Sequence, residues 1–93
     1  CRKLGVKPQS FDVIESNEAF AAQACAVSRA LDLDPGRVNP NGGAIALGHP
    51  VGASGARIVL HLLHVLRRER KQRGIATICI GGGQGGAVLV EAA

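Results

Sequence analysis

The chain has 93 residues, of which 46% are apolar and 19% charged, and its formal net charge is +4. This composition excludes a disordered chain, and no apolar run approaches the roughly 20 residues of a membrane-spanning helix. The 13 glycines exceed the usual share of roughly 7% about twofold, but they have no three-residue period, which excludes a collagen-like chain.

Ten of the thirteen glycines fall in two short stretches, one between Gly42 and Gly55 and one between Gly81 and Gly86. Clustered glycine indicates backbone held in conformations that other residues avoid. The length allows one small domain with a modest core. Because the chain contains no Met, and because Cys1–Gly5 resembles the end of a helix, we expect a C-terminal piece of a longer protein.

The positive charge is concentrated near the end of one predicted helix. Five of the eleven basic residues are Arg67, Arg68, Arg70, Lys71 and Arg73. We favour a solvated helix end whose cations complement the helix dipole, and the alternative is a patch that attracts an anionic ligand. Nucleic acid is not an expected partner, because the only aromatic side chains are two phenylalanines.

Cys1, Cys25 and Cys79 make an odd number of cysteines without paired spacing. This pattern argues against a disulfide scaffold and against a zinc site. It predicts a reducing compartment, which we take to be the cytoplasm.

The first predicted elements are a strand and a helix. Residues Phe11–Ser16 alternate apolar and polar side chains, which predicts a half-buried strand. From Asn17 or Glu18 to Leu31 the apolar residues recur with the period of a helix. The sequence Asp34–Gly36 (DPG) then predicts a turn.

Residues Val38–Gly55 form the first glycine-rich stretch and are too irregular for one element. We expect a folded loop with a short extended or helical piece near Ala44–Leu47. Ser54 is the expected N-cap of a helix over Gly55–Arg70. This helix is apolar over most of its surface, so we expect its first three turns to be buried, and Gly74 is the expected terminator.

The chain closes with two apolar runs, Ile75–Ile80 and Ala87–Glu91. The first predicts a central strand, and the six residues between the runs suit a hairpin. The strand at Phe11–Ser16 is followed by a helix and can therefore pair in parallel with a later strand. The fold class is α/β, a mixed sheet of about three strands with two helices in one unit, residues 1–93.

Two motifs with known chemistry are set aside. Gly81, Gly83 and Gly86 match G-x-G-x-x-G, but a dinucleotide site requires a helix next, and here a strand follows. His61 and His64 lie three residues apart on a helix, yet no third ligand accompanies them, so we expect structural histidines and no metal site.

His49 and Cys79 are stronger candidates for chemistry. His49 lies between glycine and proline, and Cys79 ends a strand just before three glycines. Backbone N–H groups in such a turn can hold an oxyanion beside the thiol. From these residues alone, catalysis and a purely structural tight turn remain equally open.

Three motifs together resemble the C-terminal signatures of the thiolase family, and most closely those of its acetyl-CoA acetyltransferases. They are NEAFA at Asn17–Ala21, NGGA at Asn41–Ala44 running on to GHPVGASGAR at Gly48–Arg57, and CIGGGQG at Cys79–Gly85. The order and spacing fit over essentially the whole chain. The resemblance implies that these strands belong to a five-stranded sheet in a layered αβαβα arrangement.

The resemblance also implies a role for each matching residue. His49 would activate a nucleophilic cysteine and help form an oxyanion hole, which a water held by Asn17 completes. Cys79 would be the acid/base that moves the α-proton of an acetyl group, and the N–H of Gly81 would lie in a second oxyanion hole. Ala19 and Phe20 would border the pantetheine channel of the substrate.

Thiolases form an acyl-enzyme on a cysteine from the N-terminal half, and no such motif occurs at Cys1 or Cys25. We therefore expect the C-terminal segment of an acetyl-CoA C-acetyltransferase that is inactive alone. Its expected substrates are acetyl-CoA and acetoacetyl-CoA, with no cofactor besides these coenzyme A thioesters. Expected partners are the N-terminal half and, in the complete enzyme, further copies in a homo-oligomer.

Three alternatives stay open at this point. One is a 3-ketoacyl-CoA thiolase of broader chain length. The second is a non-catalytic fragment that folds by docking on a partner chain. The third is an anion-binding glycine-loop module unrelated to acyl transfer.

Overall fold

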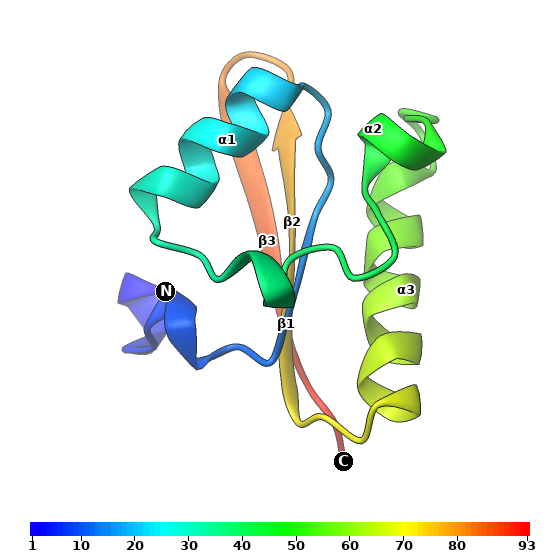
Figure 1. The fold of residues 1–93 in the computed structure, drawn as a ribbon. Helices are drawn as coiled ribbons and strands as arrows, with labels where there is room; N and C mark the ends of the chain where they lie inside the picture. The colour runs from blue at the N-terminus through cyan, green and yellow to red at the C-terminus, as the bar shows by residue number, and fades with distance from the viewer.

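A computed structural model describes all of residues 1–93 as three layers, with α1 and α3 on opposite faces of a three-stranded sheet (Figure 1). The elements in chain order are β1 (Val13–Ser16), α1 (Ala21–Ala30), α2 (Ala44–Leu47), α3 (Ser54–Arg68), β2 (Arg73–Ile80) and β3 (Gln84–Glu91). Short 3-10 turns occupy Arg2–Leu4, Pro8–Ser10 and Pro35–Arg37. The α/β class with a three-stranded mixed sheet is confirmed. None of the helices combines the length and the hydropathy that a membrane span requires.

The sheet has the order β1-β2-β3. β1 pairs with β2 in parallel, with Val13 opposite Gly74, as the sequence pattern predicts for a strand followed by a helix. β2 and β3 form an antiparallel hairpin in which Cys79 lies opposite Gly85. The outer side of β1 carries one further parallel bridge, from Ile14 to Val38.

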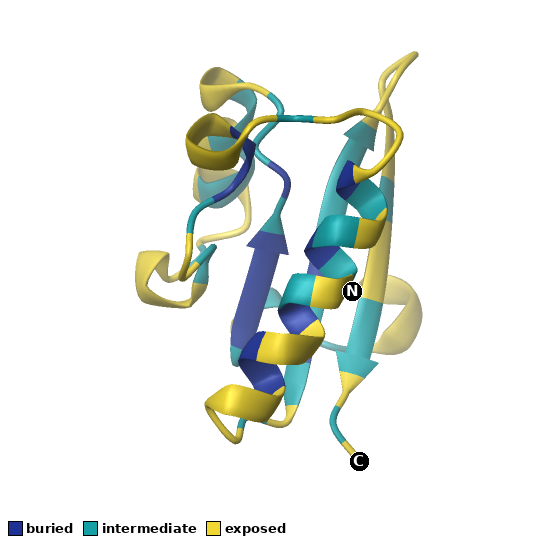
Figure 2. Ribbon diagram, turned by 90° about the vertical axis from the view of Figure 1, so that its right-hand side faces the viewer, coloured by how far each residue is buried: buried dark blue, intermediate teal, exposed yellow.

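The core lies between the sheet and α3. Its buried cluster comprises Val13, Ile58, Leu62, Val65, Leu66 and Ala76. Figure 2 shows that α3 buries only the stripe that faces the sheet. The expectation that the first three turns are buried is therefore wrong, since Leu60 remains 57% and Leu63 40% exposed. One sheet can cover only one side of a helix.

Helix α1 begins later than the sequence predicts. Residues 17–20 are not helical, and Phe20 is the N-cap of a helix that starts at Ala21. Glu18 has φ 56, a left-handed conformation that no α-helix contains. No residue of α1 is buried, so its predicted apolar face makes only partial contact with the sheet.

Two expected helix signals act differently in the structure. Ala53, not Ser54, is the N-cap of α3, and Ser54 is its first helical residue. The helix ends at Arg68, and Arg70 takes the left-handed conformation with φ 54. Gly74 lies inside β2, where a Cβ would fall 2.5 Å from Cδ1 of Leu62, so its small size serves packing and not helix termination.

The hairpin loop is shorter than expected, because β2 and β3 extend into the glycine cluster. Only residues 81–83 lie between the strands. Gly82 has φ 78 and Gly83 has φ 73, and these conformations explain why glycine is needed at the tip of the turn.

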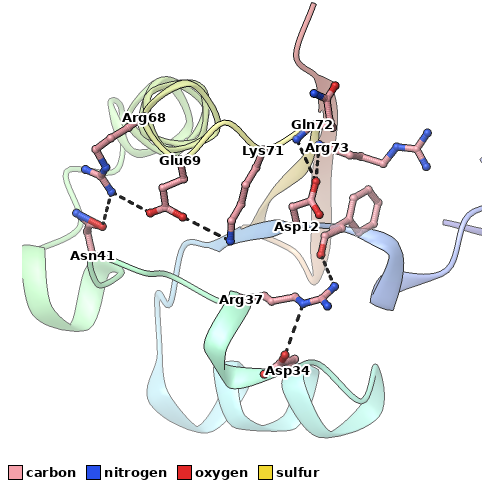
Figure 3. Close-up of polar contacts among 10 residues, drawn as sticks. Asp12, Asp34, Arg37, Asn41, Arg68, Glu69, Lys71, Gln72 and Arg73 are labelled. Atoms are coloured by element: carbon pink, nitrogen blue, oxygen red, sulfur yellow. Dashed lines mark hydrogen bonds and ion pairs between the residues drawn. The ribbon is translucent and has the colours of Figure 1, made fainter.

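The basic end of α3 is joined to its surroundings by ion pairs and hydrogen bonds (Figure 3). Glu69 lies 3.3 Å from Arg68 and 3.4 Å from Lys71, and Arg73 forms an ion pair with Glu91. These contacts support the solvated helix end over an anion-binding patch.

Candidate active site

Asn17 follows β1 directly and is almost fully buried, with 2% exposure. Its backbone N–H donates to the carbonyl of Thr77 on β2, and its carbonyl accepts from the N–H of Ala44 at the start of α2. The backbone at Asn17 is thus fixed from two sides. The positive φ of Glu18 then turns the chain away from the sheet immediately after Asn17.

The structure brings Asn17 and His49 together. The amide nitrogen Nδ2 of Asn17 lies 3.3 Å from Nδ1 of His49, and the hydroxyl of Ser54 lies 2.6 Å from the same ring nitrogen. Arg57 on α3 holds both Asn17 and the backbone just before His49. It donates to Oδ1 of Asn17 at 3.2 Å and to the carbonyl of Gly48 at 2.6 Å.

Cys79 lies near the end of β2 and is half-buried. It lines a cavity of about 450 Å³ between α1 and the sheet, together with Asn17 and Ala19. Ile14 and Val27 also line the cavity, so apolar side chains share its lining with the thiol of Cys79 and the amide of Asn17.

The other predicted site residues are less central. Gly81 is exposed at the hairpin turn, with open space where a Cβ would be. Phe20 is 73% exposed, and neither Phe20 nor His49 lines the cavity. No hydrogen bond joins Cys79 to the site. The chain alone therefore assembles the Asn17–His49 pair and places Cys79 in the cavity that Asn17 borders, while Gly81 and Phe20 stay on the surface.

Three further residues shape the site although the sequence assigned none of them a role in it. Arg57 and Ser54 hold Asn17 and His49 as described. Asn39 pairs with the backbone of Ser16 through its side chain, accepting from the N–H and donating to the carbonyl, both at 2.8 Å. Arg57 and Ser54 lie within the second motif, so their place in GASGAR was the only signal that could have found them.

A buried carboxyl group lies on the other face of β1. Glu15 is 2% exposed, and its Oε1 lies 2.7 Å from Nδ1 of His61. Burial raises the pKa of Glu15, while the charges of His61 and Arg57 oppose that rise. His61 is thus a partner of a buried acid, in line with the structural role expected of it, and His64 is exposed.

Comparison with known proteins places these motifs in one family. Residues 1–92 match the family profile described as Thiolase, C-terminal domain. Beta-ketothiolase BktB of Cupriavidus necator is 56% identical over 89 residues, which cover 96% of this chain and 23% of that protein. An acetyl-CoA acetyltransferase of Escherichia coli is 58% identical over 87 residues, covering 94% and 22%.

Solved structures agree with the sequence comparison. A crystal structure of human mitochondrial 3-ketoacyl-CoA thiolase in complex with CoA superposes with a TM-score of 0.94 at 52% identity. The match covers 99% of this chain and 23% of the human chain. The chain thus spans about a quarter of the length of the relatives it matches, and it belongs to the thiolase family as a thiolase C-terminal domain.

Proposed function

We propose that the complete protein is an acetyl-CoA C-acetyltransferase. It joins two acetyl-CoA molecules into acetoacetyl-CoA and runs the reverse thiolysis. The contact between Asn17 and His49, beside a cavity that contains Cys79, is the observation that carries this proposal. Several similar proteins bear the name acetyl-CoA acetyltransferase, among them the Escherichia coli relative.

Cys79 moves the proton in this proposal. Its thiolate takes a proton from the methyl group of acetyl-CoA, and the electron pair left behind forms an enolate. The enolate carbon then attacks the acetyl group held on the nucleophilic cysteine, so a carbon–carbon bond forms and the carbon–sulfur bond to that cysteine breaks. A thiol can both give up and take back a proton, which suits it to general acid–base catalysis.

Negative charge develops on oxygen in both steps, so donors are needed at two places. His49 and a water bound to Asn17 form one oxyanion hole, and the N–H of Gly81 contributes to the other. Ala19 borders the channel for the pantetheine arm at the mouth of the cavity, and Phe20 borders it on the surface. The similar human structure holds CoA, which supports a coenzyme A thioester as the substrate.

The test uses a complete enzyme that carries this segment. Cys79→Ser and His49→Ala should each lower kcat for thiolysis of acetoacetyl-CoA by at least about 100-fold, the scale of a lost acid/base or oxyanion donor. Cys25→Ser on the exposed surface of α1 is the matched control and should leave kcat unchanged. Near-normal activity of both site variants would refute the assignment.

We also propose that residues 1–93 do not turn over acetoacetyl-CoA alone, because the nucleophilic cysteine belongs to the N-terminal half. Adding that half as a separate chain should restore thiolysis if the two dock. Turnover by the segment alone would contradict the absence of a nucleophile. A segment that folds by docking on the added half without supporting activity would favour the non-catalytic fragment. Light scattering of the complete enzyme tests the proposed homo-oligomer.

A 3-ketoacyl-CoA thiolase of broader chain length is the second candidate. The apolar side chains in the lining of the cavity favour it, as do the names of the Cupriavidus and human relatives. The ratio of kcat/KM for acetoacetyl-CoA to that for 3-ketoacyl-CoA thioesters of increasing chain length separates the two. If kcat/KM falls steeply as the acyl chain of the substrate lengthens, the acetyltransferase is supported. If kcat/KM changes little with chain length, the broader enzyme is supported.

A further inference from the structure

The hydroxyl of Ser54 has two acceptors within reach but only one proton to donate. It lies 2.6 Å from Nδ1 of His49 and 3.2 Å from the carbonyl oxygen of Pro50. That carbonyl already accepts the backbone N–H groups of Ala53 at 2.8 Å and of Ser54 at 2.9 Å. The closer and otherwise less satisfied acceptor is therefore the ring nitrogen of His49.

The second neighbour of Nδ1 of His49, the side-chain amide of Asn17, is also a donor. The guanidinium of Arg57 can only donate, so the Asn17 atom that faces it at 3.2 Å must be the oxygen Oδ1. The amide of Asn17 is planar, and its NH2 group consequently faces Nδ1 of His49 at 3.3 Å. Arg57 thus fixes which end of the amide meets the histidine.

A ring nitrogen that faces two donors acts as an acceptor. A neutral imidazole carries one proton, so with Nδ1 accepting, that proton is on Nε2. The opposite tautomer would set the N–H of Nδ1 against the NH2 group of Asn17, donor against donor. The Ser54 hydroxyl would then have to turn to Pro50, whose carbonyl already has two N–H partners.

We propose that Ser54 is a positioning residue that holds His49 in its Nε2–H tautomer, an inference that rests on the proposed function. In this form His49 presents an N–H to the site and stabilises the enolate oxygen as a neutral donor. A positively charged ring is not required for that role. Ser54 is fully buried, so no water competes for its hydroxyl.

The experiment changes Ser54 in a complete enzyme that carries this segment and measures thiolysis of acetoacetyl-CoA. Ser54→Ala removes only the hydroxyl oxygen, and alanine suits the first turn of a helix. We expect kcat to fall about tenfold or more while KM stays within about twofold, because the interaction acts on the oxyanion and not on ground-state binding. Ser54→Thr keeps the hydroxyl and should retain more activity than Ser54→Ala. Ser28→Ala on α1 is the matched control for losing a serine hydroxyl and should change neither constant.

Each outcome decides between the two proposals. If Ser54→Ala keeps the parent kcat while His49→Ala loses activity, the role of Ser54 is wrong and the proposed function stands. If His49→Ala keeps activity as well, the proposed function itself fails. If Ser54→Ala does not fold by circular dichroism, Ser54→Thr is compared with Ser54→Cys, whose thiol is a weaker donor. A kcat at least about tenfold higher for threonine supports the inference, and equal values overturn it.

Discussion

Arg57 donates a hydrogen bond to Oδ1 of Asn17 at 3.2 Å, although 40 residues separate them in the sequence. The same guanidinium binds the carbonyl of Gly48 at 2.6 Å. One side chain on α3 therefore connects the loop that follows β1 with the loop that carries His49. The bridge therefore acts beside the direct contact of Asn17 with His49 in setting their relative position.

The bridge predicts that Arg57→Lys is a damaging change although it preserves the charge. Lysine has a single ammonium group and cannot bind the two acceptors with a planar fork. We expect kcat of the complete enzyme to fall by about 10- to 100-fold, the scale of a displacement of about 1 Å in an active site. Steady-state kinetics measure the effect. Arg67→Lys at the exposed far end of α3 is the control, and equal kcat values for the two variants would contradict the role of Arg57.

The local patterns of the sequence predict the elements well. Alternation marks the strand that ends at Ser16, the helical period marks α1 although it misplaces the start, and the short piece at Ala44–Leu47 proves to be the helix α2. Each of these features depends on neighbours within a few residues. The parallel pairing of β1 with β2 also follows from chain order, because a helix separates them.

The failures arise where packing between distant segments decides the structure. The backbone of Glu18 adopts a positive φ that its residue type does not suggest. Ser54 resembles an N-cap, but its hydroxyl is directed to His49. Gly74 resembles a helix terminator, but Leu62 occupies the space that a side chain would need. The site also depends on packing between distant segments, since the motifs indicate which residues belong to it but not which of their atoms meet.

Gly74→Ala tests the packing explanation. A Cβ at this position would lie 2.5 Å from Cδ1 of Leu62 and 3.2 Å from the carbonyl oxygen of Val13. Leu62 is fully buried and cannot move aside freely, so we expect a loss of about 1–3 kcal/mol in the free energy of unfolding. Thermal or chemical denaturation of the complete protein measures it.

A double-mutant cycle supplies the control for that prediction. Leu62→Ala alone should cost about 2–5 kcal/mol because it leaves a cavity in the core. In that background the added methyl group of Gly74→Ala has room, so its cost should largely disappear. If the two losses simply add, Gly74 is required for its backbone and not for its contact with Leu62.

The raised pKa of Glu15 predicts how the stability of the protein depends on pH. Burial raises the pKa of Glu15 above its ordinary value of 4.5, so the folded protein holds this proton more tightly than the unfolded chain. The contribution of Glu15 to the stability of the fold is therefore complete below pH 4.5 and is lost as the pH rises through the raised pKa.

Glu15→Gln tests this dependence, because the variant cannot ionise and its amide still offers His61 a hydrogen-bonding partner. We expect the difference in melting temperature, variant minus parent, to increase by a few degrees between about pH 5 and about pH 8. Glu91→Gln removes an exposed carboxylate that pairs with Arg73 and should show no such gain. A constant difference for Glu15→Gln would mean that the surrounding charges of His61 and Arg57 offset the burial of this carboxyl group. A difference that shrinks with rising pH would mean that these charges outweigh it.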